Sequence, residues 1–350
     1  MTQLATRPRP RRVLRSRGGS VSLRLHARST AATIGLVLAI AVIGVLTLTI
    51  GEYELTVSQV LSALAGEGGR AAQYVITEFR LPRWLTGLLV GAALAVSGAI
   101  MQNLARNPLG SPDFIGFTTG AATGGILMVL AGAGAAQLAF GAIAGGVLTA
   151  LAMYLLAFTK GVHGSRLVLV GVGVNAILIA VNSYLISRAS LRDATAAQAW
   201  LTGSLNSRGW EHVLPVTVAL ALLLPVAFAY GRRLSLLEMG DEAASALGVP
   251  VQRSRAILMI TSVALAGVAV ASAGPIGFVA LMAPQLTRRL TKAASAVLLP
   301  TALMGAFVVS LSDFAAQRFF SPVAVPVGVM TAAVGGVYLA WLLATEWRGR

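Results

Sequence analysis

The titratable side chains of this chain are few, and their spacing favours no catalytic chemistry. Three histidines, His26, His163 and His212, lie far apart in the sequence, and cysteine is absent. The sequence contains neither a G-x-x-x-x-G-K-[ST] phosphate-binding loop nor an H-E-x-x-H zinc motif. Without cysteine there is no thiol nucleophile and no cysteine-ligated metal. We therefore predict that the chain has no catalytic residues and no metal site.

One cluster of charged residues has a spacing that indicates contact with a partner. Asp241 and Glu242 occupy the first turn of a predicted short helix, where the helix dipole favours negative charge. The apolar residues that follow recur at helical spacing and form one small face. Because so short a helix does not persist alone in water, we expect it to dock into another protein. The predicted docking residues, within the segment 236–250, are Gly240, Asp241, Glu242, Ala243, Ala244, Leu247 and Gly248.

The rest of the chain has the composition of a membrane protein. Hydrophobic residues make up 56% of the 350 residues and charged residues only 11%, and the mean hydropathy is +0.80. Charge-free windows of about 17 to 22 residues match the helix length that crosses roughly 30 Å of hydrocarbon. We therefore predict an all-α polytopic membrane protein with about ten transmembrane helices. The predicted spans are 31–50, 84–103, 114–131, 138–158, 167–186, 212–230, 256–273, 277–290, 297–312 and 326–345.

The uneven distribution of arginine and lysine predicts the orientation. The net charge is +15, and residues 1–28 contain eight arginines and no acid. A basic arm beside an apolar run follows the positive-inside rule, so we interpret it as a topological anchor and expect no nucleic-acid partner. Contact with lipid headgroups or nucleic acid is the alternative role of the arm. With ten crossings both termini are cytoplasmic, and 20 of the 27 basic residues face the cytoplasm. The predicted parts are a basic arm at 1–30, a ten-helix domain at 31–346 and a cytoplasmic tail at 347–350.

Small residues are dense in the predicted helices. Glycines four residues apart favour the close approach of helix backbones on which helix packing in lipid depends. Such pairs are Gly87/Gly91, Gly116/Gly120, Gly120/Gly124 and Gly141/Gly145. We expect these helices to form a tight bundle.

The acidic residues give little support to an ion-coupled transporter, the second class that this composition allows. Asp113, Glu211 and Asp313 all fall at the ends of predicted spans, whereas a proton or sodium relay places charge inside them. A membrane-embedded enzyme ranks third, because no pair of titratable groups shares a helix face.

Several blocks of sequence, in order, carry a resemblance to a known family. They are 80–83, 91–99, 106–112, 240–248, 273–284 and 326–331. Together they resemble the permease family of bacterial iron-siderophore, haem and vitamin B12 ABC importers, over about residues 31–345. Within that family, the blocks around 75–112, 236–254 and 326–339 are most similar to the members that import ferric enterobactin.

The resemblance implies a type II ABC importer permease fold and a set of partners. The chain would pair with a second permease subunit, favoured to be a paralogue, with a second copy as the alternative. Two ATP-binding subunits would bind ATP and Mg²⁺ and hydrolyse the ATP, so this chain would hold no cofactor and would not be an enzyme. An extracytoplasmic siderophore-binding protein would dock on the outer face of the bacterial cytoplasmic membrane. Haem or vitamin B12 is the alternative cargo to a ferric siderophore.

The resemblance also implies roles for arginines on the outer face. Arg80 and Arg83 match outward-facing arginines that meet acidic residues of the binding protein, with headgroup contact as their alternative role. Family members often carry another arginine four residues after the aspartate that is Asp313 here. Gln317 occupies that position, so Arg318 is the candidate replacement.

Two loops match the cytoplasmic gate of the family, and 240–248 matches its coupling helices. Asn107 and Leu109 match positions near that gate, with simple turn formation as the alternative role. Gly164 and Ser165 match a second gate loop. Small hydroxyl residues occupy both latter positions in some relatives, so Gly164 is a departure from that pattern. The implied mechanism is alternating access, in which ATP binding on the partner subunits moves the helix bundle.

Overall fold

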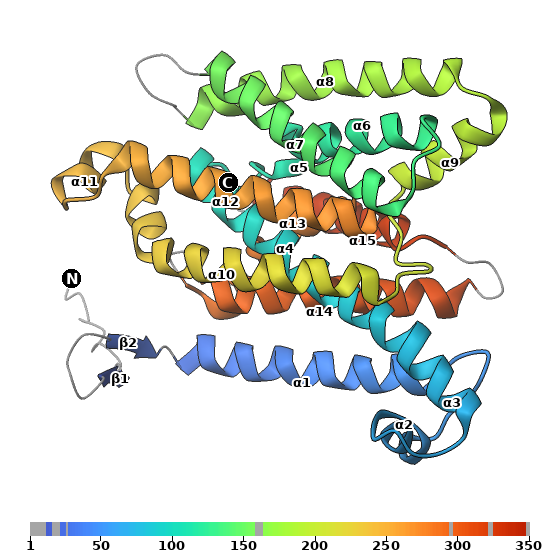
Figure 1. Cartoon of the computed structure of the whole chain (residues 1–350). Coiled ribbons are helices and arrows are strands. Elements are labelled where there is room, and N and C mark those ends of the chain that lie inside the picture. Colours follow the sequence, from blue (N-terminus) through green and yellow to red (C-terminus); the bar gives the residue numbers. More distant parts are fainter. Residues whose placement is uncertain are drawn as a thin grey trace.

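The chain folds into a bundle of long helices that run roughly along one common axis (Figure 1). The computed structural model describes residues 12–15, 22–25, 27–157, 164–293, 297–320 and 325–347. Within these ranges, seven helices are long and apolar enough to cross a membrane. The predicted all-helical membrane architecture is therefore confirmed.

Ten helices correspond one for one to the ten predicted spans. They are α1 Ala27–Thr49, α4 Leu81–Ala105, α6 Phe117–Leu130, α7 Ala135–Ala157, α8 Gly164–Arg188, α10 Trp210–Glu238, α12 Val251–Ala273, α13 Val279–Thr291, α14 Leu298–Phe319 and α15 Val327–Trp347. The helix α13 is the shortest of the ten and lies close to its predicted span of 277–290, whereas α10 and α14 extend eight and seven residues beyond their predicted ends. The 13 residues of α13 span about 20 Å, which is too short for a full crossing. Irregular backbone at 274–278, in which Gly274 and Ile276 are buried, precedes it, and protein must surround such backbone at membrane depth.

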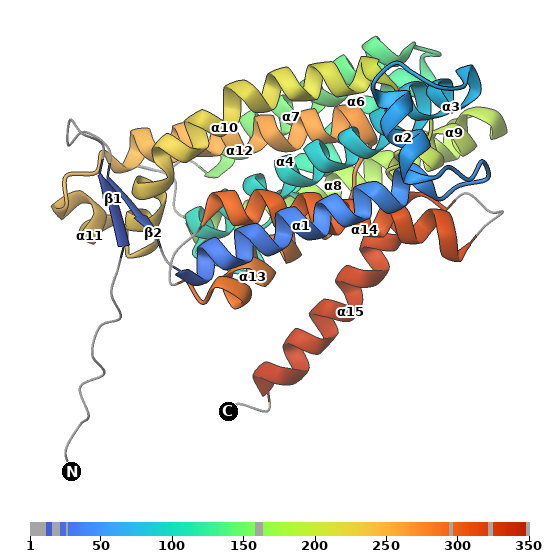
Figure 2. The same cartoon turned by 90° about the horizontal axis from the view of Figure 1, so that it is seen from below.

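Short elements lie at the two ends of the bundle. The helix α11, Asp241–Ala246, marks one end, called here the α11 end. The opposite end, called the α9 end, carries helices that the sequence did not predict (Figures 1 and 2). These are α2 Val57–Leu64, α3 Arg70–Tyr74 with the π-helical segment Val75–Arg80 that leads into α4, and α9 Leu191–Leu201. One further short helix, α5 Pro112–Ile115, precedes α6.

The basic arm contains the exception to an all-helical fold. Two short strands, β1 Arg12–Arg15 and β2 Ser22–Leu25, form an antiparallel pair with Arg12 opposite Leu25. The other residues of the predicted arm up to 26, and residues 348–350 of the predicted tail, lie outside the described residues.

The helix α4 is the centre of the bundle. It packs against α10, α12, α13 and α14, and nearly every residue from Val90 to Ala105 is buried. A helix that is apolar all round is suited to such a position. Two serines tie it to α12 by reciprocal hydrogen bonds: Ser97 Oγ donates to the Ser262 carbonyl at 2.7 Å, and Ser262 Oγ donates to the Ser97 carbonyl at 2.9 Å.

The predicted close approach of glycine-rich helices is confirmed where α6 crosses α7. A Cβ added to Gly124 would overlap the backbone of Gly141, and one added to Gly120 would reach the carbonyl of Gly145. A similar contact joins α4 to α14, where Gly91 lies against the backbone of Gly305.

Candidate functional site

The predicted short helix is present and is bounded by two glycines in unusual backbone conformations. Gly240, at φ +120°, precedes α11, and Gly248, at φ +79°, follows it. Glycine adopts positive φ at no steric cost, so these residues let the chain leave α10, form one short helix and enter α12 within a few residues. The segment therefore projects from the α11 end of the bundle (Figure 1).

Asp241 holds this short helix to the rest of the protein. Its Oδ1 accepts hydrogen bonds from Arg255 Nη2 at 2.8 Å and from Arg106 Nη2. Arg106 follows the last residue of α4, and its Nε also donates to the Leu237 carbonyl at 3.1 Å, near the end of α10. Partial burial alone would raise the pKa of Asp241, but the two guanidinium groups outweigh it and hold that pKa below its usual value. Asp241 thus joins three helices.

The apolar face of α11 is divided between the protein interior and solvent. Leu247 is 60% exposed, as a docking residue should be. Ala244 is fully buried against the chain itself, so the prediction that it forms part of a displayed face is wrong. The helix packs on α10 and α12 through its Ala244 side, and this packing leaves Glu242 and Leu247 outside.

The predicted gate turn lies beside this attachment. Asn107 and Leu109 form a side-chain turn in which the Leu109 amide donates to Asn107 Oδ1 at 2.9 Å. Gln285 of α13 donates from its Nε2 to the Pro108 carbonyl at 2.8 Å. The turn is therefore fixed to α13 on one side and, through the neighbouring Arg106, to α11 on the other.

Arg288 completes the network at this end, and sequence reasoning missed it. Its Nη2 donates to Asn103 Oδ1 of α4 at 3.0 Å, and its Nη1 lies 3.3 Å from Glu238 Oε1 of α10. Position in the last turn of α13 was the available signal, because basic residues there complement the helix dipole. The second predicted gate pair, Gly164 and Ser165, begins α8, and only its backbone is among the described features.

The arginines predicted to dock a binding protein all have partners within the chain. Arg83 makes a bidentate pair with Asp313 of α14, with Nε–Oδ2 at 3.0 Å and Nη2–Oδ1 at 2.7 Å. Arg80 donates to the Leu48 and Tyr53 carbonyls, each at 2.6 Å, and Arg318 donates to the Ile50 carbonyl. Docking remains a prediction, and the structure adds the role of tying α1, α4 and α14 together.

Asp313 does not lie at the end of a span, as the sequence suggested. The helix α14 continues to Phe319, so Asp313 lies inside it with a buried carboxylate. Gln317, one turn later, donates from its Nε2 to Asp313 Oδ2 at 2.8 Å. The position that carries an arginine in many family members therefore completes the Asp313 cluster here.

A polar cavity lies between α6, α8 and α9, and the sequence analysis did not identify it. Its volume is about 610 Å³. The polar residues that line it are Thr118, Thr119, Asn182, Ser183, Ser187 and Gln198. Within an apolar helix, polar residues such as Asn182, Ser183 and Ser187 share one face, and this spacing was the missed signal. Among the described residues, no group of three His, Asp or Glu side chains could hold a metal ion.

Known proteins with similar sequences are iron and siderophore permeases. Residues 37–345 match the FecCD transport family. The ferric enterobactin transport system permease protein FepG of Escherichia coli is 46% identical over 314 residues, which cover 89% of this chain and 95% of FepG. The Bacillus subtilis siderophore transport system permease protein YfhA is 37% identical, over 84% of this chain and 88% of YfhA.

A solved structure shares the architecture as well. A metal-chelate type ABC transporter in an inward-facing conformation matches with a TM-score of 0.81 and 32% identity, over 90% of this chain and 99% of that one. The family match over residues 37–345 spans the helix bundle and the α11 segment together. This chain is a member of the FecCD transport family of ABC importer permeases.

Proposed function

We propose that this chain is one permease subunit of a bacterial ABC importer that carries a ferric siderophore of the enterobactin class across the cytoplasmic membrane. Its partners are a second permease subunit, favoured as a paralogue, two ATP-binding subunits that hydrolyse ATP with Mg²⁺, and an extracytoplasmic siderophore-binding protein. The similarity to FepG and to other iron permeases supports the class of cargo. The chain itself contributes part of the passage for the cargo and the short helix α11, which would transmit motion from an ATP-binding subunit.

The observation that carries this proposal is the form of α11. A six-residue helix, bounded by glycines, presents Glu242 and Leu247 outward while Asp241 joins it to the ends of α4, α10 and α12. An exposed leucine on so short a helix is stabilised best by a partner's surface. A force applied to α11 would reach the central helix α4 through the contact between the Asp241 carboxylate and Arg106.

We place the α11 end in the cytoplasm. Ten basic residues lie near helix ends on this side, namely Arg28, Arg106, Arg166, Arg232, Arg233, Arg253, Arg255, Arg288, Arg289 and Lys292. The positive-inside rule favours this orientation. Both ends of the described bundle, the start of α1 and the end of α15, then face the cytoplasm.

We assign the polar cavity to the passage for the cargo. Amide and hydroxyl groups at membrane depth are costly against lipid, so a face that carries Asn182, Ser183 and Ser187 favours contact with protein or water. The passage would form where this face meets the second permease subunit. Thr118 and Thr119 of α6 extend the same polar wall.

We expect the binding protein to dock at the α9 end. Arg80, Arg83 and Arg318 are engaged within the chain there, so they would shape the docking surface and would not offer free guanidinium groups. Asp313 and the carbonyls after α1 are the groups that hold them in place.

Uptake by the reconstituted importer tests the cargo. Proteoliposomes that contain both permease subunits and the ATPase, with the binding protein outside and ATP inside, should accumulate radiolabelled ferric enterobactin. Unlabelled haem and cyanocobalamin serve as competitors. Accumulation of the label that only unlabelled ferric enterobactin reduces supports the proposal. No accumulation of the label, or its reduction by haem or cyanocobalamin, contradicts it.

A further inference from the structure

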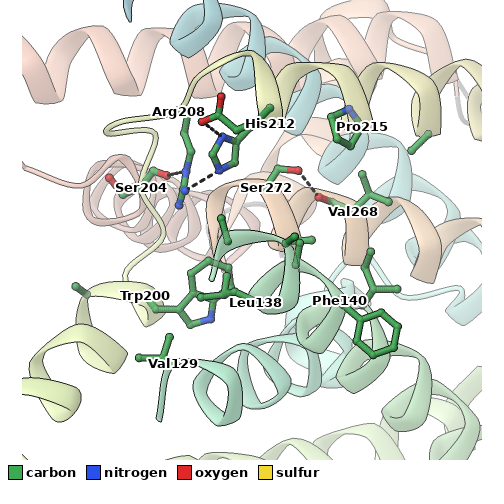
Figure 3. A pocket seen from close by; sticks show the side chains of 18 of the residues that line it. Val129, Leu138, Phe140, Trp200, Ser204, Arg208, His212, Pro215, Val268 and Ser272 are labelled. Carbon is green, nitrogen blue, oxygen red and sulfur yellow. Dashed lines mark hydrogen bonds and ion pairs between the residues drawn. The ribbon is translucent and has the colours of Figure 1, made fainter. Parts of the chain in front are cut away.

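A second cavity, outside the proposed passage, lies near the α9 end of the bundle. Its volume is about 990 Å³, and Figure 3 shows it from close by. The helices α7 and α10 both pack on α12, and the cavity lies between them, with the end of α6 and α9 closing it at one side. None of the predicted site residues lines it.

Apolar side chains form the walls of this groove. Leu138, Phe140 and Ile143 come from α7, Pro215 from α10 and Val268 from α12. Phe140 is 72% exposed, so the groove opens sideways on the bundle surface, where the bilayer surrounds the helices. An acyl chain of a lipid fits these walls. The polar end of the groove then decides which lipid headgroup can bind.

Three polar side chains stand in a row at that end (Figure 3). Arg208 Nη1 lies 3.0 Å from His212 Nε2, and His212 Nδ1 lies 3.1 Å from Glu211 Oε1. Arg208 Nε also donates to the Ser204 carbonyl at 3.3 Å. The row therefore places a cation and an anion on either side of one imidazole. The described contacts leave Arg208 Nη2 available as a donor.

Arg208, His212 and Glu211 lie at the end of the membrane-spanning helices, at the level expected for lipid headgroups. Arg208 belongs to the loop between α9 and α10, and Glu211 is in the first turn of α10. Trp210 begins α10 directly after this loop, and tryptophan gathers at the level of lipid headgroups. An apolar groove that ends in paired opposite charges at headgroup depth matches one lipid type in shape and in charge.

We propose that this groove binds a phosphatidylethanolamine molecule of the leaflet at the α9 end. The phosphate accepts hydrogen bonds from Arg208, the primary ammonium donates to Glu211, and one acyl chain lies along Leu138, Phe140 and Val268. The adjacent charges favour a zwitterionic headgroup, because a purely anionic lipid would place negative charge beside Glu211 without a compensating amine.

Native mass spectrometry of the purified full chain, with matched phosphatidylethanolamine and phosphatidylglycerol, tests this assignment. We expect the chain to retain phosphatidylethanolamine about tenfold more strongly, the scale of one charge-assisted contact. Arg208→Gln should lower that retention by about tenfold, and Glu211→Gln should abolish the preference between the two lipids. Arg192→Gln, an exposed arginine of α9 outside the groove, is the control and should change neither.

A groove-filling variant keeps the test decisive if a charge variant folds poorly. Ala219→Phe places a ring inside the groove and should displace the lipid, whereas Val218→Phe, on the adjacent exposed position, should not. Equal retention of both lipids by the native chain, or full retention by Ala219→Phe, overturns the proposal. Loss of the lipid when the complete importer assembles also overturns it, because a partner protein would then be the occupant.

Discussion

The two ends of the bundle use the same residue pair, arginine and aspartate, in opposite surroundings. At the α9 end, Arg83 and Asp313 are 19% and 6% exposed and share two hydrogen bonds. At the α11 end, Arg106 and Asp241 are 42% and 37% exposed. The first pair lies between two packed helices, and the second lies at the base of a short projecting helix.

This difference indicates that one end is fixed and the other can move. Breaking a buried pair leaves a charge without a partner in a medium of low dielectric constant, which costs several kcal/mol. An exposed pair contributes little, because water replaces the lost contact. The Arg106–Asp241 contact between α11 and α4 can therefore shift at low cost when a partner moves α11, while Arg255, which is 6% exposed, keeps Asp241 attached to α12. At the other end, α4 and α14 stay together.

The largest effect is expected from Asp313→Ala. This change leaves Arg83 buried without its partner and should destabilise the protein by about 3–5 kcal/mol. Thermal unfolding of the purified chain measures it. The double variant Arg83→Met/Asp313→Leu removes both charges and should recover most of the loss. An unchanged Tm for Asp313→Ala would mean that the Arg83–Asp313 pair contributes no more to stability than the exposed pair at the α11 end.

The second-largest effect is expected where α6 packs closely against α7. Gly124→Ala adds a Cβ that overlaps the Gly141 backbone, so we expect a loss of about 1–3 kcal/mol from overpacking between α6 and α7. Gly173→Ala, in α8 with open space around it, should be neutral or slightly stabilising. Thermal unfolding distinguishes the two variants. Equal Tm values would show that α6 and α7 can move apart to accept the added Cβ without loss of stability.

Leu247→Asp tests the exposed end directly. If Leu247 packs against an ATPase subunit as proposed, a charge at this position removes that apolar contact, so we expect uptake to fall by about tenfold, with little change in Tm. ATP hydrolysis and uptake are measured on the same proteoliposomes. Leu191→Asp, also exposed but at the α9 end, is the control for ATPase coupling. Full coupling in Leu247→Asp would remove α11 from that role.

The smallest effect is expected from Asp241→Asn. The Arg106 pair is exposed, and asparagine keeps an Oδ1 that can accept a hydrogen bond from the buried Arg255, so stability should fall by less than about 1 kcal/mol. The position of α11 relative to α4 depends on the carboxylate, so uptake per ATP hydrolysed should still fall a few-fold. A stability loss as large as that of Asp313→Ala would contradict the comparison, and so would an unchanged ratio of uptake to hydrolysis.

Local patterns in the sequence predicted most of the fold and little of the contact network. Charge-free windows located ten helices, and the glycine pairs around Gly124 and Gly145 located the crossing of α6 and α7. The short length of α13 also had a local signal, because Gly274, Pro275 and Gly277 favour a break before it. The full lengths of α10 and α14 did not, because charged residues near their ends lie inside the helices. Partners such as Arg83 and Asp313 are 230 residues apart, and one sequence does not show which residues meet.

In the candidate site, too, the features with local sequence signals were predicted and those that depend on tertiary packing were not. The glycines at 240 and 248 and the acid at 241 are local signals, and they placed α11 correctly. The inward face of Ala244 and the bridge made by Arg288 depend on how α10, α11 and α13 pack together. Exposed arginines were predicted at the α9 end, but their partners on α1 and α14 were not.

The energy source of transport tests the central claim most directly. Uptake of ferric siderophore is compared in proteoliposomes that hold this chain alone under a proton or sodium gradient and in proteoliposomes that hold the complete importer with internal ATP and no gradient. The account predicts uptake only in the second, with its loss when ATP is replaced by a non-hydrolysable analogue. Uphill uptake by the chain alone on an ion gradient would contradict it.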